Sequence, residues 1–250
     1  MKRTLIILAL VGIAAAAQAQ QEPDYSGWTA LLRKYYDPAK GMDYAGLQAR
    51  DARTLQALRN GLAKVNVAAL NRKQQLAYWI NVYNVNTVAT IVENYPVQSI
   101  RDISTDPIIR LNVFKKDRVP FGGGKLSLNA VENDKIREGF HDPRIHFAIN
   151  CAARSCPPIR PEAFTGARVD AQLDDQARKF LSSVRISGKT AHVTKIMDWF
   201  GDDFDQWGGG KSAFLRRYLS ADKQRLLDQA GSDLDFSYDD YDWSLNDWKR

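Results

Sequence analysis

The chain has 250 residues, of which 44% are hydrophobic, and a formal charge of +6. This length can bury a sizeable core, and we expect one globular domain over residues 20–250. Basic and acidic residues are interleaved, as between Asp51 and Lys64, so the sequence lacks the basic stripe of a nucleic-acid-binding protein and no nucleic-acid partner is expected.

Residues 1–19 have the features of a cleavable secretory signal peptide. Lys2 and Arg3 precede an apolar run from Leu5 to Ala17, and residues 17–19 give the small-x-small pattern that signal peptidase recognises. The run is too short for a comfortable membrane span, and no later segment approaches the roughly 20 apolar residues that a bilayer requires. We therefore expect a soluble mature protein, periplasmic or secreted, whose formal charge falls from +6 to +4 when Lys2 and Arg3 are removed.

The rest of the sequence predicts a helix-rich α+β fold with a small, mainly antiparallel sheet. Helices are expected over residues 25–36, 44–62, 72–94, 127–137, 170–182, 211–219 and 221–229. The helix over 72–94 has the clearest signal, because its apolar residues lie on one side and Pro96 ends it. A buried strand is expected over 144–150, a β-hairpin around Gly188 over 184–194, and final-strand packing within the aromatic and acidic stretch 234–248.

Candidate chemistry is concentrated between residues 143 and 158, where a histidine precedes two cysteines. The expected strand carries His146 and leads directly into Cys151 and Cys156. An imidazole near a thiol is the arrangement that activates a thiolate, so Cys151 is the predicted nucleophile and His146 its base. Side chains five positions apart on an extended strand point to opposite faces, so contact between the two requires a bend near Asn150.

Three other interpretations of these residues stay open. In an oxidising compartment, Cys151 and Cys156 can form a disulfide that stabilises a tight turn. The same cysteines with His146, aided by His141, carry zinc-type donors, but their spacing matches none of the usual zinc patterns, and we predict no metal or other cofactor. A thioredoxin-like motif has two residues between its cysteines and this pair has four, so oxidoreductase activity is the least favoured interpretation.

Two asparagines stand out in the strongest predicted helix. Asn81 and Asn84 are three residues apart and therefore share a face. Asparagine is a poor helix former, which indicates that both amides have a specific task. They either satisfy backbone groups inside the core or orient a catalytic group or a ligand.

Glu132 is a further candidate, near the start of a predicted helix. It either caps that helix or, as a carboxylate, orients His146 or acts as a base. The predicted site therefore has a catalytic set and a binding set. The catalytic set is Cys151, His146, Glu132 and Asn81, and the binding set is Asn84, Arg144 and Cys156.

Several separated motifs give the chain a family resemblance. They lie, in order, at residues 78–84, 128–132, 144–158, 172–174 and 241–246. Together they resemble the domain of unknown function 547 family, whose histidine, cysteine and Cys-Pro motif falls on His146, Cys151 and Cys156-Pro157. Relatives in plants keep the first cysteine and lose the second, so the resemblance implies that Cys151 is the better candidate for a nucleophile.

The sequence leads to two hypotheses of different classes. The first is an exported cysteine-dependent hydrolase or acyl transferase that acts on an amide or ester, with Cys151 as the attacking group. The second is a non-enzymatic cell-envelope binding or assembly module, with a structural Cys151–Cys156 disulfide and an aromatic surface from the stretch 235–243. In both cases the expected partner is a small molecule, a peptide or an envelope ligand.

Overall fold

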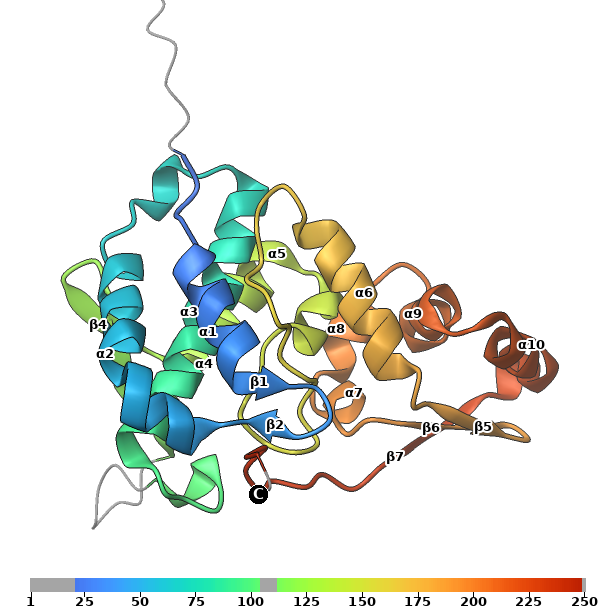
Figure 1. Ribbon diagram of the computed structural model, residues 1–250. Helices are drawn as coiled ribbons and strands as arrows, with labels where there is room; N and C mark the ends of the chain where they lie inside the picture. Colours follow the sequence, from blue (N-terminus) through green and yellow to red (C-terminus); the bar gives the residue numbers. More distant parts are fainter. Residues whose placement is uncertain (1–20, 104–111, 249–250) are drawn as a thin grey trace, which may run out of the picture.

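The computed structural model describes residues 21–103 and 112–248 and has the predicted helix-rich α+β fold (Figure 1). The predicted signal peptide lies outside the described residues. The strands among these residues form three small sheets, and their pairing is antiparallel except where β7 joins β6. Within the described part of the chain, none of the helices combines the length and apolar character needed to cross a bilayer.

The N-terminal third is a group of helices around a buried central one (Figure 1). It contains α1 (Ser26–Tyr35), β1 (Tyr36–Asp37), β2 (Gly41–Met42), α2 (Tyr44–Leu62), the short η1 (Val67–Ala69) and α3 (Arg72–Asn94). The predicted bounds of α2 and α3 are confirmed, and α1 differs by one residue at each end. Asn71 and Gln74 form a capping box that fixes the start of α3.

Helix α3 is buried on all sides, whereas the sequence predicts one apolar face. Every residue from Leu76 to Val92 is buried, including Asn81, Asn84 and Asn86. An unpaired buried amide costs about 1–3 kcal/mol, so the buried asparagines of this helix are expected to find partners. Asn81, Asn84 and Asn86 each bond to a segment that packs around α3.

The middle of the chain is built from short turns of helix and one hairpin. It contains η2 (Ile100–Asp102), η3 (Val113–Lys115), β3 (Asp117–Phe121), β4 (Gly124–Ser127), α4 (Leu128–Ala130), the π-helix η4 (Val131–Arg137), α5 (Glu138–Phe140) and η5 (Pro143–Phe147). The predicted helix over 127–137 is present, with Ser127 as its N-cap, but seven of its residues form a π-helix. π-Helical turns are rare and are frequently found at functional sites.

The strand predicted over residues 144–150 is wrong. The segment forms the 3-10 helix η5, which begins at Pro143 and is capped by the Asp142 side chain accepting from the Arg144 N–H. Proline at the first helical position has a φ suited to a helix, and a short apolar run alone does not distinguish a strand from a buried helical turn.

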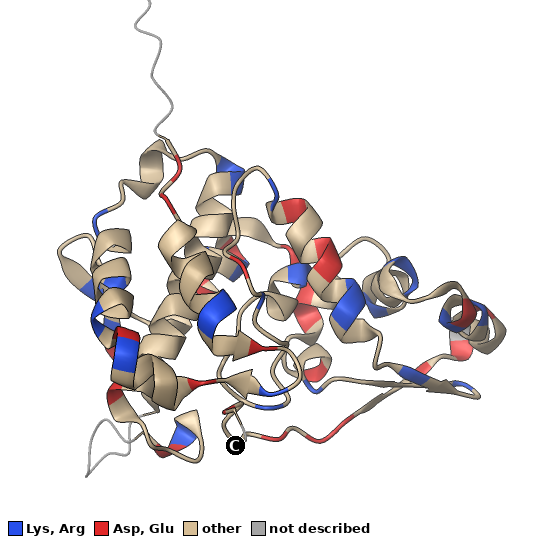
Figure 2. Ribbon diagram, in the orientation of Figure 1, with Lys and Arg blue, Asp and Glu red and all other residues tan. Residues whose placement is uncertain are grey.

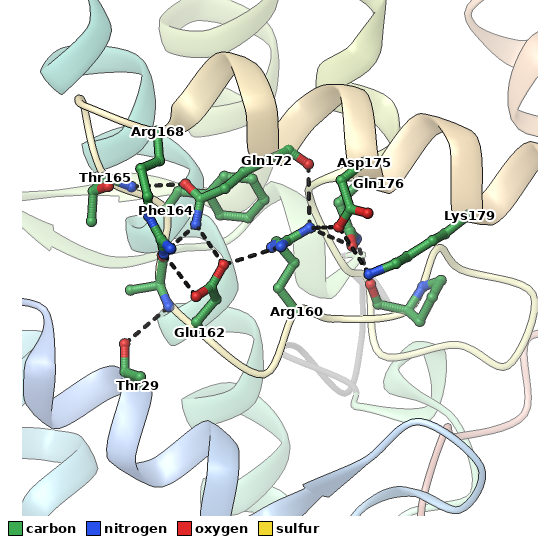
Figure 3. Close-up of polar contacts among 12 residues, drawn as sticks. Thr29, Arg160, Glu162, Phe164, Thr165, Arg168, Gln172, Asp175, Gln176 and Lys179 are labelled. Carbon is green, nitrogen blue, oxygen red and sulfur yellow. Dashed lines mark hydrogen bonds and ion pairs between the residues drawn. The ribbon is translucent and has the colours of Figure 1, made fainter. Parts of the chain in front are cut away.

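Helix α6 (Val169–Leu181) anchors the loop that follows the cysteines (Figure 3). Gln172 donates to the Ala163 carbonyl and accepts from the Thr165 N–H. Gln176 donates to the carbonyls of Phe147 and Pro158, 3.0 and 2.8 Å away, and so ties together the two flanks of the cysteine segment.

The C-terminal third packs a small sheet against helices. It contains β5 (Arg185–Ser187), β6 (Thr190–Val193), α7 (Ile196–Trp199), α8 (Gly201–Asp205), α9 (Gly210–Tyr218), α10 (Ala221–Ala230), η6 (Gly231–Asp233) and β7 (Asp235–Tyr238). The predicted hairpin is confirmed as β5–β6, with Gly188 at φ 58° in its turn. The predicted final strand is β7, which pairs in parallel with β6.

After β7 the chain runs back across the molecule to β2 (Figure 1). Its end pairs with Met42 through Asp247 and with Ala153 through Leu245. Buried hydrophobic residues form two clusters, one around α3 and one around α9, and Phe147 of η5 belongs to the second while its neighbour Ile145 belongs to the first. Figure 2 shows basic and acidic residues interleaved over the elements in that view.

Candidate functional site

A pocket of about 160 Å³ receives side chains from both hydrophobic clusters and contains four of the seven predicted site residues. Glu132 comes from η4, His146 from η5, and Cys151 and Cys156 from the loop that follows η5. The remaining wall is largely aromatic and includes Tyr83, Phe114, Trp199, Phe200, Tyr241 and Trp243. The volume is close to that of a cavity of about 150 Å³ that binds one benzene molecule, so it suits one ring or a short acyl group.

The cysteine loop is held in place by three asparagine side chains. Asn84 of α3 donates to the Ala148 carbonyl and accepts from the Asn150 N–H, at 2.9 and 2.8 Å. Asn150 accepts from the Ala152 N–H and donates to the Pro157 carbonyl, closing the loop across its base. Asn246 donates to the Asn150 side chain and connects the C-terminal segment to the same network.

The fold brings the two cysteine side chains into contact despite the four residues between them. Ala152 adopts φ 63°, a left-handed conformation that is strained for a residue other than glycine, and Cys156 donates its N–H to the Ala153 carbonyl. This tight turn places the two Sγ atoms 2.8 Å apart, both as free thiols. The disulfide between Cys151 and Cys156 stays a prediction, and the turn brings the two sulfurs close enough for it to form.

The two thiols have different environments. Both cysteines line the pocket, but Cys151 is half-buried whereas Cys156 is buried. Hydrogen bonding with Cys156, and further with Tyr241 and the Ala153 backbone, lowers the pKa of Cys151 against the opposing effect of burial. Burial and the neighbouring Cys151 raise the pKa of Cys156 well above its usual value. Cys151 is therefore the thiol that ionises first.

His146 is fixed by a carboxylate that the sequence analysis did not identify. Its Nε2 lies 2.7 Å from Oδ2 of Asp203 in α8, and Arg137 holds that carboxylate through two bonds of 2.7 and 2.9 Å. Burial opposes the ionisation of Asp203, but the bonds from His146 and Arg137 hold its pKa well below the usual range. An ionised acceptor requires the proton on Nε2, which leaves Nδ1 as the basic nitrogen of the ring.

The His146 ring is also enclosed by aromatic side chains. It stacks on Phe200 with ring centroids 4.1 Å apart and is almost fully buried. Burial lowers the pKa of His146 below its ordinary value, although Asp203 opposes the shift. The imidazole is therefore neutral at neutral pH and can accept a proton, but its hydrogen bond goes to Asp203 while those of Cys151 go to Cys156 and Tyr241. The predicted dyad is a pair of groups lining one pocket, and a substrate or water must connect them.

Glu132 bonds to Tyr83 of α3, a different partner from the predicted His146. Desolvation raises the pKa of Glu132 to about 7, while Tyr83 and Arg137 act in the opposite direction. A carboxyl group with such a pKa can donate or accept a proton near neutrality.

Replacing Glu132 by glutamine is expected to change how stability depends on pH. The folded pKa is raised to about 7 from the ordinary 4.5, so the contribution of this group is fully present below about pH 4.5 and is lost as the pH rises through about 7. Glutamine does not ionise, so Glu132→Gln removes this loss. The free energy of unfolding of the variant, relative to that of the wild type, should therefore rise by up to about 3 kcal/mol between about pH 5 and pH 8. Urea unfolding of both proteins across this range measures the difference. If the free energies of unfolding of the two proteins change in parallel with pH, the raised pKa of Glu132 is contradicted.

An aromatic cluster forms the rim of the pocket. Tyr241 lies 4.8 Å from both Trp199 and Trp243 by ring centroids, and Trp199 is 45% exposed although it is a large apolar side chain. Arg101 lies over the Trp243 ring at 5.1 Å. Rigid, partly exposed aromatic rings at a pocket mouth are typical of surfaces that contact planar or apolar ligands.

Three predicted site residues lie outside the pocket and bond to other parts of the chain. Asn81 is fully buried and bonds to both backbone groups of Phe164, so it holds the loop after the cysteines and faces no oxyanion. Asn84 positions the cysteine loop and does not line the cavity. Arg144 forms ion pairs with Asp142, Asp170 and Asp174, which join η5 to α6 and occupy its guanidinium.

Sequence reasoning missed Asp203, Tyr83 and the position of Tyr241. Asp203 is one of several aspartates in its region, and nothing local distinguishes it from Asp202 or Asp205. Tyr241 belongs to a stretch identified as aromatic and acidic, but its place against Cys151 depends on the return of the C-terminal segment over the cysteine loop. Among the described residues, no group of three or more His, Cys, Asp or Glu side chains is arranged to hold a metal ion.

Comparison with known proteins gives one match. Residues 67–181 match the model of the family described as "Protein of unknown function, DUF547". This segment contains α3, η4, η5, the cysteine loop and the whole of α6, and so includes Glu132, His146, Cys151 and Cys156. No curated protein and no solved structure matches the chain.

Proposed function

The chain belongs, through residues 67–181, to the family of proteins of unknown function DUF547, and we propose that it is a cysteine-dependent hydrolase or acyl transferase acting on a small ester or amide. The observation that carries the proposal is the position of Cys151. Its thiol faces a pocket, has a lowered pKa and shares that pocket with a neutral histidine and a carboxyl group whose pKa is about 7. These are the groups that acyl transfer through a thioester requires.

The proposed reaction has two steps. The Cys151 thiolate attacks the carbonyl carbon, a C–S bond forms, and the bond to the leaving alcohol or amine breaks as that group takes a proton from Glu132. A water molecule or a second nucleophile then attacks the thioester, His146 accepts its proton, and the C–S bond breaks to regenerate the Cys151 thiolate. The proton on His146 passes through solvent to Glu132, which returns both groups to their starting states. Asp203 keeps the proton of the neutral imidazole on Nε2 and stabilises the imidazolium that forms.

The size and lining of the pocket favour a small acyl group. About 160 Å³ accommodates one ring or a short chain, and the aromatic wall favours an apolar group. Trp199, Tyr241 and Trp243 lie where the remainder of the substrate would extend from the pocket. We propose export to the periplasm or the exterior on the predicted signal peptide alone.

The test is to trap the acyl-enzyme. The reduced protein is mixed with 4-nitrophenyl phenylacetate, quenched in acid and analysed by intact mass and peptide mapping. The proposal predicts one phenylacetyl group on Cys151 and a burst of nitrophenol equal to the protein concentration. Acylation of surface lysines without modification of Cys151 would refute it.

A second candidate, a binding module, is favoured by one observation, the 45% exposure of Trp199 within an aromatic cluster. In that case the ligand would bind at the rim without covalent chemistry. Binding of an aromatic acid amide, followed by tryptophan fluorescence, in a protein that forms no acyl-enzyme would support this alternative.

A further inference from the structure

The Cys151 and Cys156 pair has the arrangement of an attacking and a resolving thiol. The Sγ atoms are 2.8 Å apart, and the Cys151 backbone N–H also donates to the Cys156 sulfur at 2.9 Å. Covalent S–S bonds are about 2.05 Å long, so a displacement of less than about 1 Å joins the two sulfurs. A nucleophilic cysteine used only for acyl transfer needs no second thiol in this position.

The two thiols also differ in access. Both thiols line the aromatic pocket, but Cys151 is half-buried whereas Cys156 is only 7% exposed. An external reagent therefore reaches Cys151 first, and Cys156 is placed to attack whatever forms there. The Tyr241 hydroxyl lies 3.1 Å from Cys151 Sγ. Once Cys151 is ionised, this hydroxyl is the donor of the pair and stabilises the thiolate both as attacking and as leaving group.

We propose that this pair is an exchange-active dithiol that reduces small external disulfides. The inference shares the nucleophile Cys151 with the proposed function but needs no acyl substrate. The least favoured interpretation of the sequence, oxidoreductase activity, becomes plausible because the turn at Ala152 brings the two sulfurs into contact without a two-residue spacing.

The electrons and atoms balance through two exchanges. The Cys151 thiolate attacks one sulfur of the external disulfide, the external S–S bond breaks, and a thiolate leaves with its electron pair and takes a proton. A mixed disulfide remains on Cys151. Cys156, after giving its proton to Glu132 or solvent, attacks Cys151 Sγ, expels the second external thiolate and leaves an intramolecular disulfide. An external dithiol reductant restores both protein thiols by the reverse exchange.

Oxidised glutathione is the probe that tests this sequence. The reduced wild-type protein, Cys156→Ser and Cys151→Ser are each incubated with it, quenched in acid and analysed by intact mass. The wild type should lose two hydrogens and carry no glutathione. Cys156→Ser should accumulate a stable mixed disulfide on Cys151, and Cys151→Ser should react at least about tenfold more slowly.

Three results would overturn the inference. These are a mixed disulfide that persists on the wild type, reaction of Cys151→Ser as fast as that of Cys156→Ser, or no reaction at all. The readout is independent of ester turnover. Disulfide exchange without acyl-enzyme formation therefore rejects only the proposed function, and acyl-enzyme formation without exchange rejects only this inference.

Discussion

Replacing Cys151 by serine is expected to lower the turnover of an activated aromatic ester by roughly 10⁴-fold or more. Removing the nucleophile of an enzyme that works through a covalent intermediate has an effect of this order, because the remaining groups retain only binding and electrostatic catalysis. A serine hydroxyl in the same position is not ionised near neutral pH. The hydrogen bonds that favour a Cys151 thiolate therefore do not activate it.

Stability provides the control for this variant. Cys151 is half-buried and serine is nearly isosteric, so the free energy of unfolding should change by no more than about 1 kcal/mol. Initial rates and urea unfolding, measured on the same preparations, separate the two effects. A fall of several kcal/mol with turnover retained would indicate a structural cysteine and favour the binding module.

Replacing Asn84 by alanine is expected to destabilise the protein by about 4 kcal/mol and to raise the pKa of the Cys151 thiol. The amide is buried and satisfies two backbone groups of the cysteine segment, each of which costs about 1–3 kcal/mol when left unpaired. Releasing the Asn150 backbone also loosens the turn that brings Cys156 to Cys151. Urea unfolding gives the first quantity, and the pH dependence of iodoacetamide labelling gives the second.

Asn81 is the matched control for Asn84. It is equally buried on the same helix and also bonds to two backbone groups, both of Phe164. Asn81→Ala should therefore destabilise the protein by a similar amount but leave the labelling profile of Cys151 unchanged. If both variants change the pH dependence of Cys151 labelling equally, the change follows from general destabilisation of the protein and not from the contacts of Asn84 with the cysteine loop. Where the alanine variants fail to fold, Asn84→Asp keeps the acceptor for the Asn150 N–H, Asn81→Asp keeps the acceptor for the Phe164 N–H, and these two variants serve in their place.

Much of the fold could be predicted because the signals are local. Helices α2 and α3 were predicted with their observed bounds, since their apolar periodicity and the stop at Pro96 depend only on neighbouring residues. The error at residues 144–150 has the opposite cause. Its apolar run is compatible with a strand or a helical turn, and the choice depends on packing between two hydrophobic clusters.

The candidate site likewise contains residues that local sequence signals identify and residues that only the fold brings in. Glu132, His146 and Cys151 line the pocket and are all identified from the sequence, because chemically reactive residue types close together in the chain can be found without a structure. Asp203 and Tyr241 enter from segments 57 and 90 residues away from their partners, and no local pattern encodes those contacts. The same limit explains Asn81, whose polar character was noticed but whose partner, 83 residues later, was not predictable.

The most direct test of the account is the residue-resolved rate of alkylation of the reduced protein by iodoacetamide as a function of pH. A cysteine-containing peptide alkylated alongside supplies the reference thiol. The account predicts that Cys151 is modified first and with an apparent pKa below that of the peptide, while Cys156 stays unmodified until the protein unfolds. Modification of Cys156 first, or a Cys151 profile at or above that of the peptide, would contradict the assignment of Cys151 as the nucleophile.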